Sequence, residues 1–189
     1  MKTEIECRLL NCNEQEIIAK LEELGATFVG DWLQMRYCYD FNPVRDNSWI
    51  RLRTNGETTA LTIKEITSSK IDGTKESEII VSDFNATDEI LNKLGYSARS
   101  KQENRRIQYK LDNVEIDIDF WPQIPTYVEF EAESEQDILN VCKKLQINTN
   151  QLTTMDVSAI YKSYGKNGRA SVLMLEEERK YSTYNQQIN

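Results

Sequence analysis

The chain opens with Thr3-Glu4-Ile5-Glu6-Cys7-Arg8-Leu9-Leu10, and a second alternating segment, Tyr127-Val128-Glu129-Phe130-Glu131-Ala132-Glu133, lies near its end. Charged and apolar residues alternate strictly in both segments. Side chains at positions i, i+2 and i+4 share one face of a β-strand. Like charges along one strand face repel each other unless a cation lies near them. The pattern therefore predicts two strands, each with an acidic face that needs a positively charged partner.

The same alternation recurs along most of the chain. Eight segments show it, at about 2–10, 32–42, 48–55, 58–66, 75–82, 101–111, 113–121 and 125–133. Apolar residues at helical spacing indicate helices after Asn13, from Thr87 to the residue before Gly95, and from Ser134 onward. Turn-forming pairs such as Asn55-Gly56 separate consecutive strands. Because most neighbouring strands are joined as hairpins, we expect an antiparallel sheet and an α+β fold.

The polar faces of these strands carry charges instead of neutral polar groups. The third, fourth and sixth strands are basic, and the first, fifth, seventh and eighth are acidic. An open sheet would place such faces in water. An eight-stranded antiparallel barrel would instead turn the charged faces inward, with the helices packed outside on the apolar faces. The similar number of acidic and basic strands favours the barrel, because an interior lined by both signs neutralises itself and can hold a charged ligand.

Composition excludes several classes of protein. The formal net charge of −8 argues against a nucleic-acid partner. The absence of histidine removes imidazole metal ligands and Ser-His or Cys-His nucleophile pairs. No apolar run approaches the ~20 residues of a membrane span, and the N-terminus lacks the pattern of a secretion signal. Four scattered cysteines fit reduced thiols. We therefore expect a cytoplasmic protein, a monomer or homodimer, with no membrane contact.

The charged residues on the inward faces indicate the kind of ligand. Converging arginine and lysine side chains suit a polyanion, and arginine binds phosphate oxygens through a planar fork. Clustered carboxylates suit Mg²⁺ or Mn²⁺, which prefer oxygen ligands and often bridge protein to phosphate. The chain has no GxxxxGK[ST] loop. Together these features predict a metal–triphosphate site that is not a P-loop.

Over about residues 1–165 the chain resembles the CYTH superfamily, the triphosphate tunnel metalloenzymes. The hallmark ExExK of that family is matched by Glu4-x-Glu6-x-Arg8, and its RxR and LTxK-like strands by Arg51-Leu52-Arg53 and Leu61-Thr62-Ile63-Lys64. Its acidic pair is similar to Glu76-x-Glu78, and its K-x-R-x-x-Y strand resembles Asn104-Arg105-Arg106-Ile107-Gln108-Tyr109. The later aspartate and the F-x-E-x-E element correspond to Asp119 and to Tyr127-Val128-Glu129-Phe130-Glu131.

The resemblance implies an eight-stranded barrel that forms a tunnel, with a triphosphate-bearing small molecule and one or two Mg²⁺ or Mn²⁺ ions inside. It assigns catalysis to Glu4, Glu6 and Arg8. Substrate binding falls to Arg8, Arg51, Arg53, Lys64, Arg106 and Lys162. The metal ligands would be Glu4, Glu6, Asp119, Glu129 and Glu131, and Glu76, Glu78 and Asp117 would also line the tunnel. Three functions stay open: a triphosphatase acting on inorganic, nucleoside or thiamine triphosphate, an adenylate cyclase, and a binding module without turnover.

Two positions depart from the family pattern. Arg8 replaces a lysine, and arginine is planar and not realistically deprotonated. Asn104 replaces a second lysine, and Arg105 beside it has the wrong parity to compensate unless the strand bulges. Asp40 shares its parity with Gln34 and Arg36, so we expect it to face inward. Residues 166–189 are expected to form a C-terminal extension to the tunnel domain, with a short helix as one option.

Overall fold

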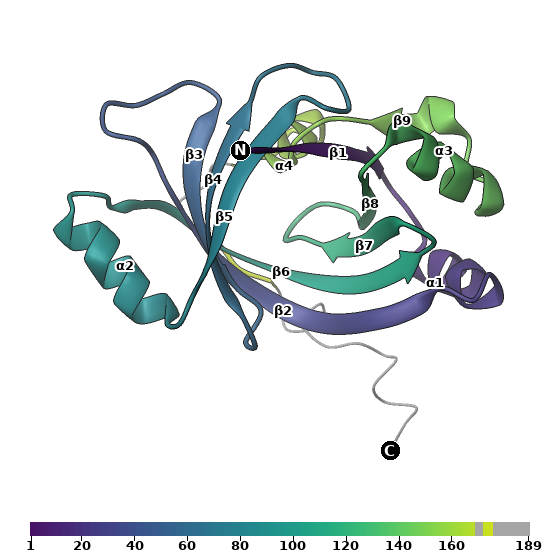
Figure 1. Ribbon diagram of the computed structural model, residues 1–189, viewed down its shortest axis with the longest axis horizontal. Helices are drawn as coiled ribbons and strands as arrows, with labels where there is room; N and C mark the ends of the chain where they lie inside the picture. The colour runs from purple at the N-terminus through teal and green to yellow at the C-terminus, as the bar shows by residue number, and fades with distance from the viewer. Residues whose placement is uncertain (169–171, 176–189) are drawn as a thin grey trace.

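The computed structural model describes residues 1–168 and 172–175, and its centre is a closed, eight-stranded antiparallel barrel (Figure 1). The strands are β1 (Lys2–Leu9), β2 (Thr27–Tyr39), β3 (Ser48–Thr54), β4 (Thr59–Ile66), β5 (Thr74–Val81), β6 (Ala98–Leu111), β7 (Val114–Phe120) and β8 (Tyr127–Ala132). They pair in the order β6-β2-β3-β4-β5-β1-β8-β7, and β7 returns to β6. The barrel predicted from the sequence is confirmed.

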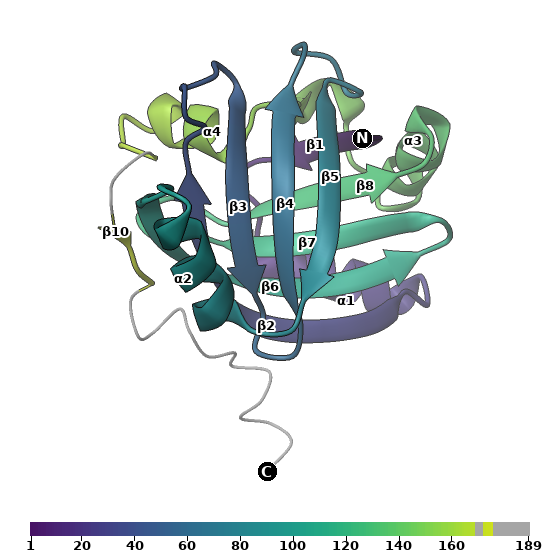
Figure 2. The same cartoon turned by 60° about the vertical axis from the view of Figure 1, so that its left-hand side comes forward.

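Four α-helices lie outside the barrel in the described part of the chain (Figure 2). They are α1 (Glu14–Glu23), α2 (Phe84–Lys93), α3 (Glu135–Lys144) and α4 (Val157–Ser163). A 3-10 turn at Thr149–Gln151 leads into the short strand β9 (Leu152–Thr153), which pairs with β1. None of the helices in the described ranges is long and apolar enough to cross a membrane.

The helices cover much of the apolar outer surface of the barrel, which explains why the charged faces turn inward. Helices α1 and α3 bury Leu21 and Ile138 against β6, β7 and β8. Helix α2 places Phe84 and Leu91 over β2 and β3. Helix α4 packs Ile160 into a third cluster near the end of β7. The outer faces beneath these helices are therefore removed from water, which favours this arrangement, whereas Ile79 on β5 remains 61% exposed.

The helix starts follow side-chain capping. Asn13 accepts hydrogen bonds from the backbone N–H groups of Gln15 and Glu16, and Ser134 caps α3, both as predicted. Helix α2 begins earlier than predicted, at Phe84 instead of Thr87. Asp83 supplies its cap by accepting from the backbone of Ala86.

Strand β2 also starts earlier than predicted, at Thr27 instead of residue 32, because its first residues pair with the far end of β6. After the barrel, Val172–Leu173 form a short strand, β10, that runs parallel to β6 beside Lys101 and Gln102. This part of the expected extension is therefore not helical. Residues 176–189, the other part for which a helix was open, lie outside the described residues.

Candidate functional site

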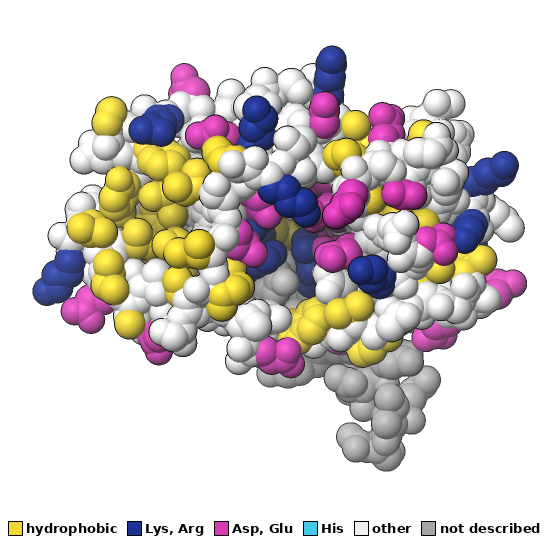
Figure 3. All heavy atoms as spheres, viewed as in Figure 1, with side chains coloured by type: hydrophobic (Ala, Val, Ile, Leu, Met, Phe, Trp, Pro, Cys, Tyr) yellow, Lys and Arg dark blue, Asp and Glu magenta, His cyan; other side chains and the backbone are white. Residues whose placement is uncertain are grey.

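The charged strand faces meet in one cavity of about 850 Å³ inside the barrel. Cross-strand pairing places Glu6 opposite Glu131 and Arg8 opposite Glu129, so these four side chains share the inward face. The next pairs along the sheet bring Asp117 beside Glu129. Figure 3 shows acidic and basic side chains gathered around the hollow at the centre of the molecule. The strand faces that the sequence predicts to be charged are therefore the faces that point into the barrel.

Most of the predicted site residues line this cavity. They are Glu4, Glu6, Arg8, Arg51, Arg53, Lys64, Glu76, Glu78, Arg106, Asp117, Glu129 and Glu131. Two predicted residues do not. Lys162 is exposed on α4, and Asp119 is fully buried behind the lining, with both carboxylate oxygens bonded to Arg106.

The carboxylates on β1 are held by cations of the protein itself. Lys64 on β4 donates to both oxygens of Glu4, at 3.1 and 2.8 Å. Glu6 accepts from Arg8 at 2.9 Å and from the hydroxyl of Thr74 at 3.1 Å. Arg8 also pairs with Glu129 and donates to the carbonyl oxygen of Met155 at 3.0 Å. Arg8 is therefore an internal counter-ion of the acidic side as well as a lining residue.

Glu131 differs from these carboxylates because it forms no ion pair or hydrogen bond within the described chain. Burial, with Glu4 and Glu129 nearby, raises the pKa of Glu131 to about 7. Burial also raises the pKa of Glu4, although Lys64 opposes the shift. The carboxylates on this side thus carry more negative charge than their partners neutralise.

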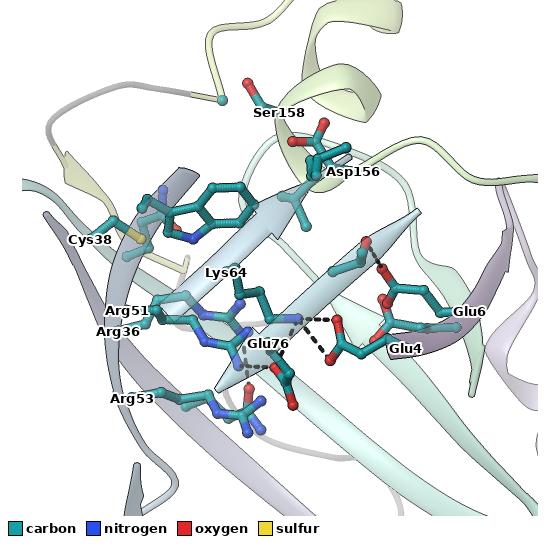
Figure 4. A pocket seen from close by; sticks show the side chains of 18 of the residues that line it. Glu4, Glu6, Arg36, Cys38, Arg51, Arg53, Lys64, Glu76, Asp156 and Ser158 are labelled. Atoms are coloured by element: carbon teal, nitrogen blue, oxygen red, sulfur yellow. Dashed lines mark hydrogen bonds and ion pairs between the residues drawn. The ribbon is translucent and has the colours of Figure 1, made fainter. Parts of the chain in front are cut away.

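Three arginines face them from the other side of the cavity, from β2 and β3 (Figure 4). Arg36 lies directly opposite Arg53 in the strand pairing, and Arg51 follows on the same face of β3. The nearest carboxylate is 3.6 Å from Arg51 and 3.9 Å from Arg53, in both cases Glu78. Repulsion by Arg51, followed by burial, lowers the pKa of Arg53 to about 9. This side therefore has an excess of positive charge.

Another cation, Arg106 on β6, has all of its charge paired with carboxylates. It forms a forked pair with Asp119, at 2.9 and 2.6 Å, and it also pairs with Asp117 and, at 3.2 Å, with Glu129. Burial opposes the charge of Arg106, but the three carboxylates raise its pKa well above the ordinary value. Asp119 therefore orients Arg106, so Asp119 supports the cavity lining and is not part of it.

Arg36 is the main residue that the predicted site set omits. It lines the cavity and is 6% exposed. Its parity with Gln34 and Asp40 was the available signal, since all three were expected on one face. Asp40 does reach the cavity rim, where it pairs with Arg99. Trp32 and Trp49 also line the cavity.

Arg105, considered as a replacement for the charge missing at position 104, does not enter the cavity, and neither does Lys101 on the same strand. Arg105 points away from the cavity and holds Asp31 on β2 at 2.7 and 2.9 Å. The strand pairing is regular at this point, so no bulge reverses the parity. Lys101 lies over the ring of Tyr37, 4.5 Å from its centroid, on the outer face.

The donor chemistry of the acidic side fits a hard divalent cation. The candidate ligands are carboxylate oxygens alone, from Glu4, Glu6, Glu129 and Glu131, and such oxygens are what Mg²⁺ and Mn²⁺ prefer. The uncompensated charge near Glu131 is a physical reason for a cation there. Within the described ranges no three such side chains are already grouped as a metal centre. Lys64 and Arg8 occupy several of these oxygens, so we expect metal binding to exchange ion pairs.

The raised pKa of Glu131 predicts a pH-dependent stability for the metal-free protein. The pKa of Glu131 is higher in the folded state than in the unfolded chain. The stability of the fold with a neutral Glu131 is therefore fully present below about pH 4.5 and is lost as the pH rises through about 7. We expect E131Q to gain about 1–3 kcal/mol over wild type between pH 5 and pH 8. Urea unfolding of both proteins with EDTA at several pH values measures this. A constant difference would show that Glu131 titrates normally.

Comparison with known proteins places these features in a family. The model of the CYTH domain family matches residues 2–164. No curated protein sequence matches the chain significantly.

Solved structures share the fold. The PH1012 protein from Pyrococcus horikoshii has a TM-score of 0.70 at 24% identity, and the alignment covers 81% of this chain and 96% of that one. A candidate adenylate cyclase from Vibrio parahaemolyticus has a TM-score of 0.62 at 13% identity, covering 99% and 98%. HpAC1 from Hippeastrum, a candidate adenylyl cyclase described as having a dominant triphosphatase activity, has a TM-score of 0.57 at 16% identity, covering 90% and 100%. At these identities the likeness concerns the fold.

Proposed function

Because the chain belongs to the CYTH domain family, we propose that it is a divalent-metal-dependent hydrolase of triphosphate compounds. The observation that carries this proposal is the division of charge across the cavity. Arginines with few partners face carboxylates that also lack enough partners. A metal–triphosphate complex carries the complementary charges, since its phosphates suit the arginines and its cation suits the carboxylates.

The basic side would bind the triphosphate chain. Arg51 and Arg53 project from one strand face, with guanidinium groups that bind phosphate oxygens through a planar fork. Lys64 lies between this pair and Glu4, so it can contact phosphate while it remains near the carboxylate (Figure 4). Arg106 adds a fixed positive charge from β6, held in place by Asp119. These groups would also stabilise the charge that builds up during phosphoryl transfer.

The acidic side would hold the metal through Glu4, Glu6, Glu129 and Glu131. Mg²⁺ or Mn²⁺, when bound, neutralises phosphate charge and makes a water molecule more acidic. Asp119 is not among the ligands that we propose, because Arg106 and Asn104 occupy its oxygens. The exposed Lys162 is likewise left out of the substrate contacts. Glu76, Glu78 and Asp117 would position the cations around the phosphates.

Arg8 would act as a positively charged clamp and not as a base. A guanidinium is not realistically deprotonated in proteins, and Glu129 and Glu6 raise the pKa of Arg8 despite its burial. Its contacts with both carboxylates fix their positions around the metal that we propose. The proton of the attacking water must therefore go to another group or to solvent.

The decisive experiment measures products from tripolyphosphate, ATP and thiamine triphosphate with Mg²⁺ or Mn²⁺. Orthophosphate release would support the hydrolase and rank its substrates. Cyclic AMP with pyrophosphate from ATP would instead identify an adenylate cyclase. Absence of both products, with tight ligand binding, would identify a binding module. The presence of Arg8 where the family pattern has lysine is a reason to consider that outcome.

Ligand binding should also stabilise the fold. We expect tripolyphosphate with Mg²⁺ to raise the melting temperature, because a ligand at 100 times its dissociation constant adds about 2.7 kcal/mol to the free energy of unfolding. Differential scanning fluorimetry with tripolyphosphate, with and without EDTA, measures the effect. Equal concentrations of orthophosphate serve as a control for general anion binding. Identical shifts with both anions would contradict a site built for a triphosphate chain.

A further inference from the structure

Arg36 on β2 is a buried cation for which the cavity provides no counter-ion. Within the described ranges no carboxylate lies within ion-pair distance of its guanidinium. Its Nη2 donates to Gln34 at 2.9 Å and to Oδ1 of Asn104, which are both neutral amides. Its Nε is buried without a hydrogen-bond partner. A buried, unpaired charge is unfavourable, so its retention calls for an anion that arrives from outside.

The surroundings of Arg36 fix its orientation instead of neutralising it. Its guanidinium carbon lies 4.5 Å from the ring centroid of Trp121, a stacking contact that supports a planar cation. The amide oxygens of Gln34 and Asn104 hold one end of the fork. The side chain is therefore set in place before any ligand binds, which lowers the entropic cost of binding.

Arg36 also belongs to the group of arginines that repel each other. It stands directly across the strand pair from Arg53, and burial, Arg51 and Arg106 lower its pKa to about 10. Like charges in directly opposed positions destabilise a sheet. A polyanion would relieve the repulsion among all of these guanidinium groups at once.

The strand next to β2, β6, does not bring a positive charge to this part of the cavity. Asn104 on β6 presents no charge to the cavity. It accepts a hydrogen bond from Arg36 and donates to Asp119 at 3.1 Å, so it connects Arg36 to the supporting carboxylate of Arg106. Arg105 and Lys101 lie on the outer face of the same strand.

We propose that Arg36 binds the phosphate oxygens of the substrate through its guanidinium fork, and that it supplies from β2 the positive charge that Asn104 does not supply from β6. The inference deepens the proposed function, because it names a further ligand of the same triphosphate site. It identifies a cationic position that sets the affinity for a triphosphate chain.

The test is calorimetric binding of tripolyphosphate with Mg²⁺ to four proteins. They are the wild type, R36Q, the double variant R36Q/N104K, and K101Q. Lys101 is a matched control because it loses the same charge on the outer face of the barrel. We expect R36Q to bind about 10- to 100-fold more weakly, K101Q to match wild type, and the double variant to recover most of the loss.

Each result bears on a separate claim. Failure of wild type to bind would overturn the proposed function itself. Tight binding by wild type and equal binding by R36Q would overturn the role of Arg36 alone. A weakened R36Q without recovery in the double variant would overturn the claim that the charge at position 36 replaces one at position 104.

Folding of R36Q is checked by thermal melting. We expect its melting temperature to equal or exceed that of wild type, because Arg36 forms no ion pair and is repelled by Arg51. If R36Q does not fold, R36K is the second variant, since it retains the charge but not the planar fork. We expect R36K to bind measurably more weakly than wild type, and equal affinity would overturn the forked contact.

Discussion

Replacing Glu131 with glutamine should reduce metal-dependent phosphate release from tripolyphosphate at least 100-fold. Glu131 is the proposed metal ligand that has no ion pair in the described chain, so its charge is the most available to a cation. Partners that merely orient metal ligands already contribute about 10- to 100-fold to affinity or activity, and a direct ligand should contribute at least as much. Steady-state phosphate release at saturating Mg²⁺ measures the loss.

The fold should tolerate this substitution. Glutamine keeps the size of the side chain and removes a charge that is repelled by Glu4 and Glu129. The melting temperature of metal-free E131Q should therefore equal or exceed that of wild type at pH 8. E133Q is the matched control, because Glu133 is exposed just after the end of β8. Full activity in E131Q would remove Glu131 from the metal site that we propose.

The barrel was predictable because alternation is a local signal. A strand that reads Glu4-Ile5-Glu6 can bury only one kind of face against the helices, so parity decides which residues meet inside. The cross-strand pair of Glu6 and Glu131 follows from that rule and from closure of the sheet. The three helices expected from the sequence were found for the same reason, through spacing and capping.

What the sequence did not predict depends on neighbours in space. Parity put Arg36 on the inward face, but nothing local distinguished a cation bound to a carboxylate from one that lacks a partner. Asp119 has the inward parity of a ligand, yet Arg106 and Asn104 take up its oxygens. Helix α2 starts early because Asp83 caps it and Phe84 is buried beneath it. These outcomes are set by pairings between strands and helices, which a strand pattern alone does not specify.

Replacing Arg106 with glutamine should have the largest effect on stability. Arg106 is the shared partner of Asp117, Asp119 and Glu129, and its loss leaves buried carboxylates without their main counter-ion. Removing one member of a buried ion pair costs about 3–5 kcal/mol. We expect a loss of that size in the free energy of unfolding at pH 8, measured by urea denaturation.

A comparison inside the same cavity separates this effect from the loss of any arginine. R53Q makes the same chemical change, but the nearest carboxylate is 3.9 Å from Arg53 and Arg51 repels it, so R53Q should not be destabilised. The loss of stability in R106Q should also become smaller as the pH falls towards 5.

Burial, together with Asp119 and Glu129, already raises the pKa of Asp117 to about 7 although Arg106 opposes the shift. Without Arg106 the carboxylates should take up protons more readily and lose their mutual repulsion. The double variant R106Q/D119N should recover part of the stability. Equal stability of R106Q and R53Q at pH 8 would show that Arg106 serves ligand binding and not the fold. A loss confined to R106Q would instead mean that one arginine holds the acidic strands together while those on β2 and β3 remain available for an anion.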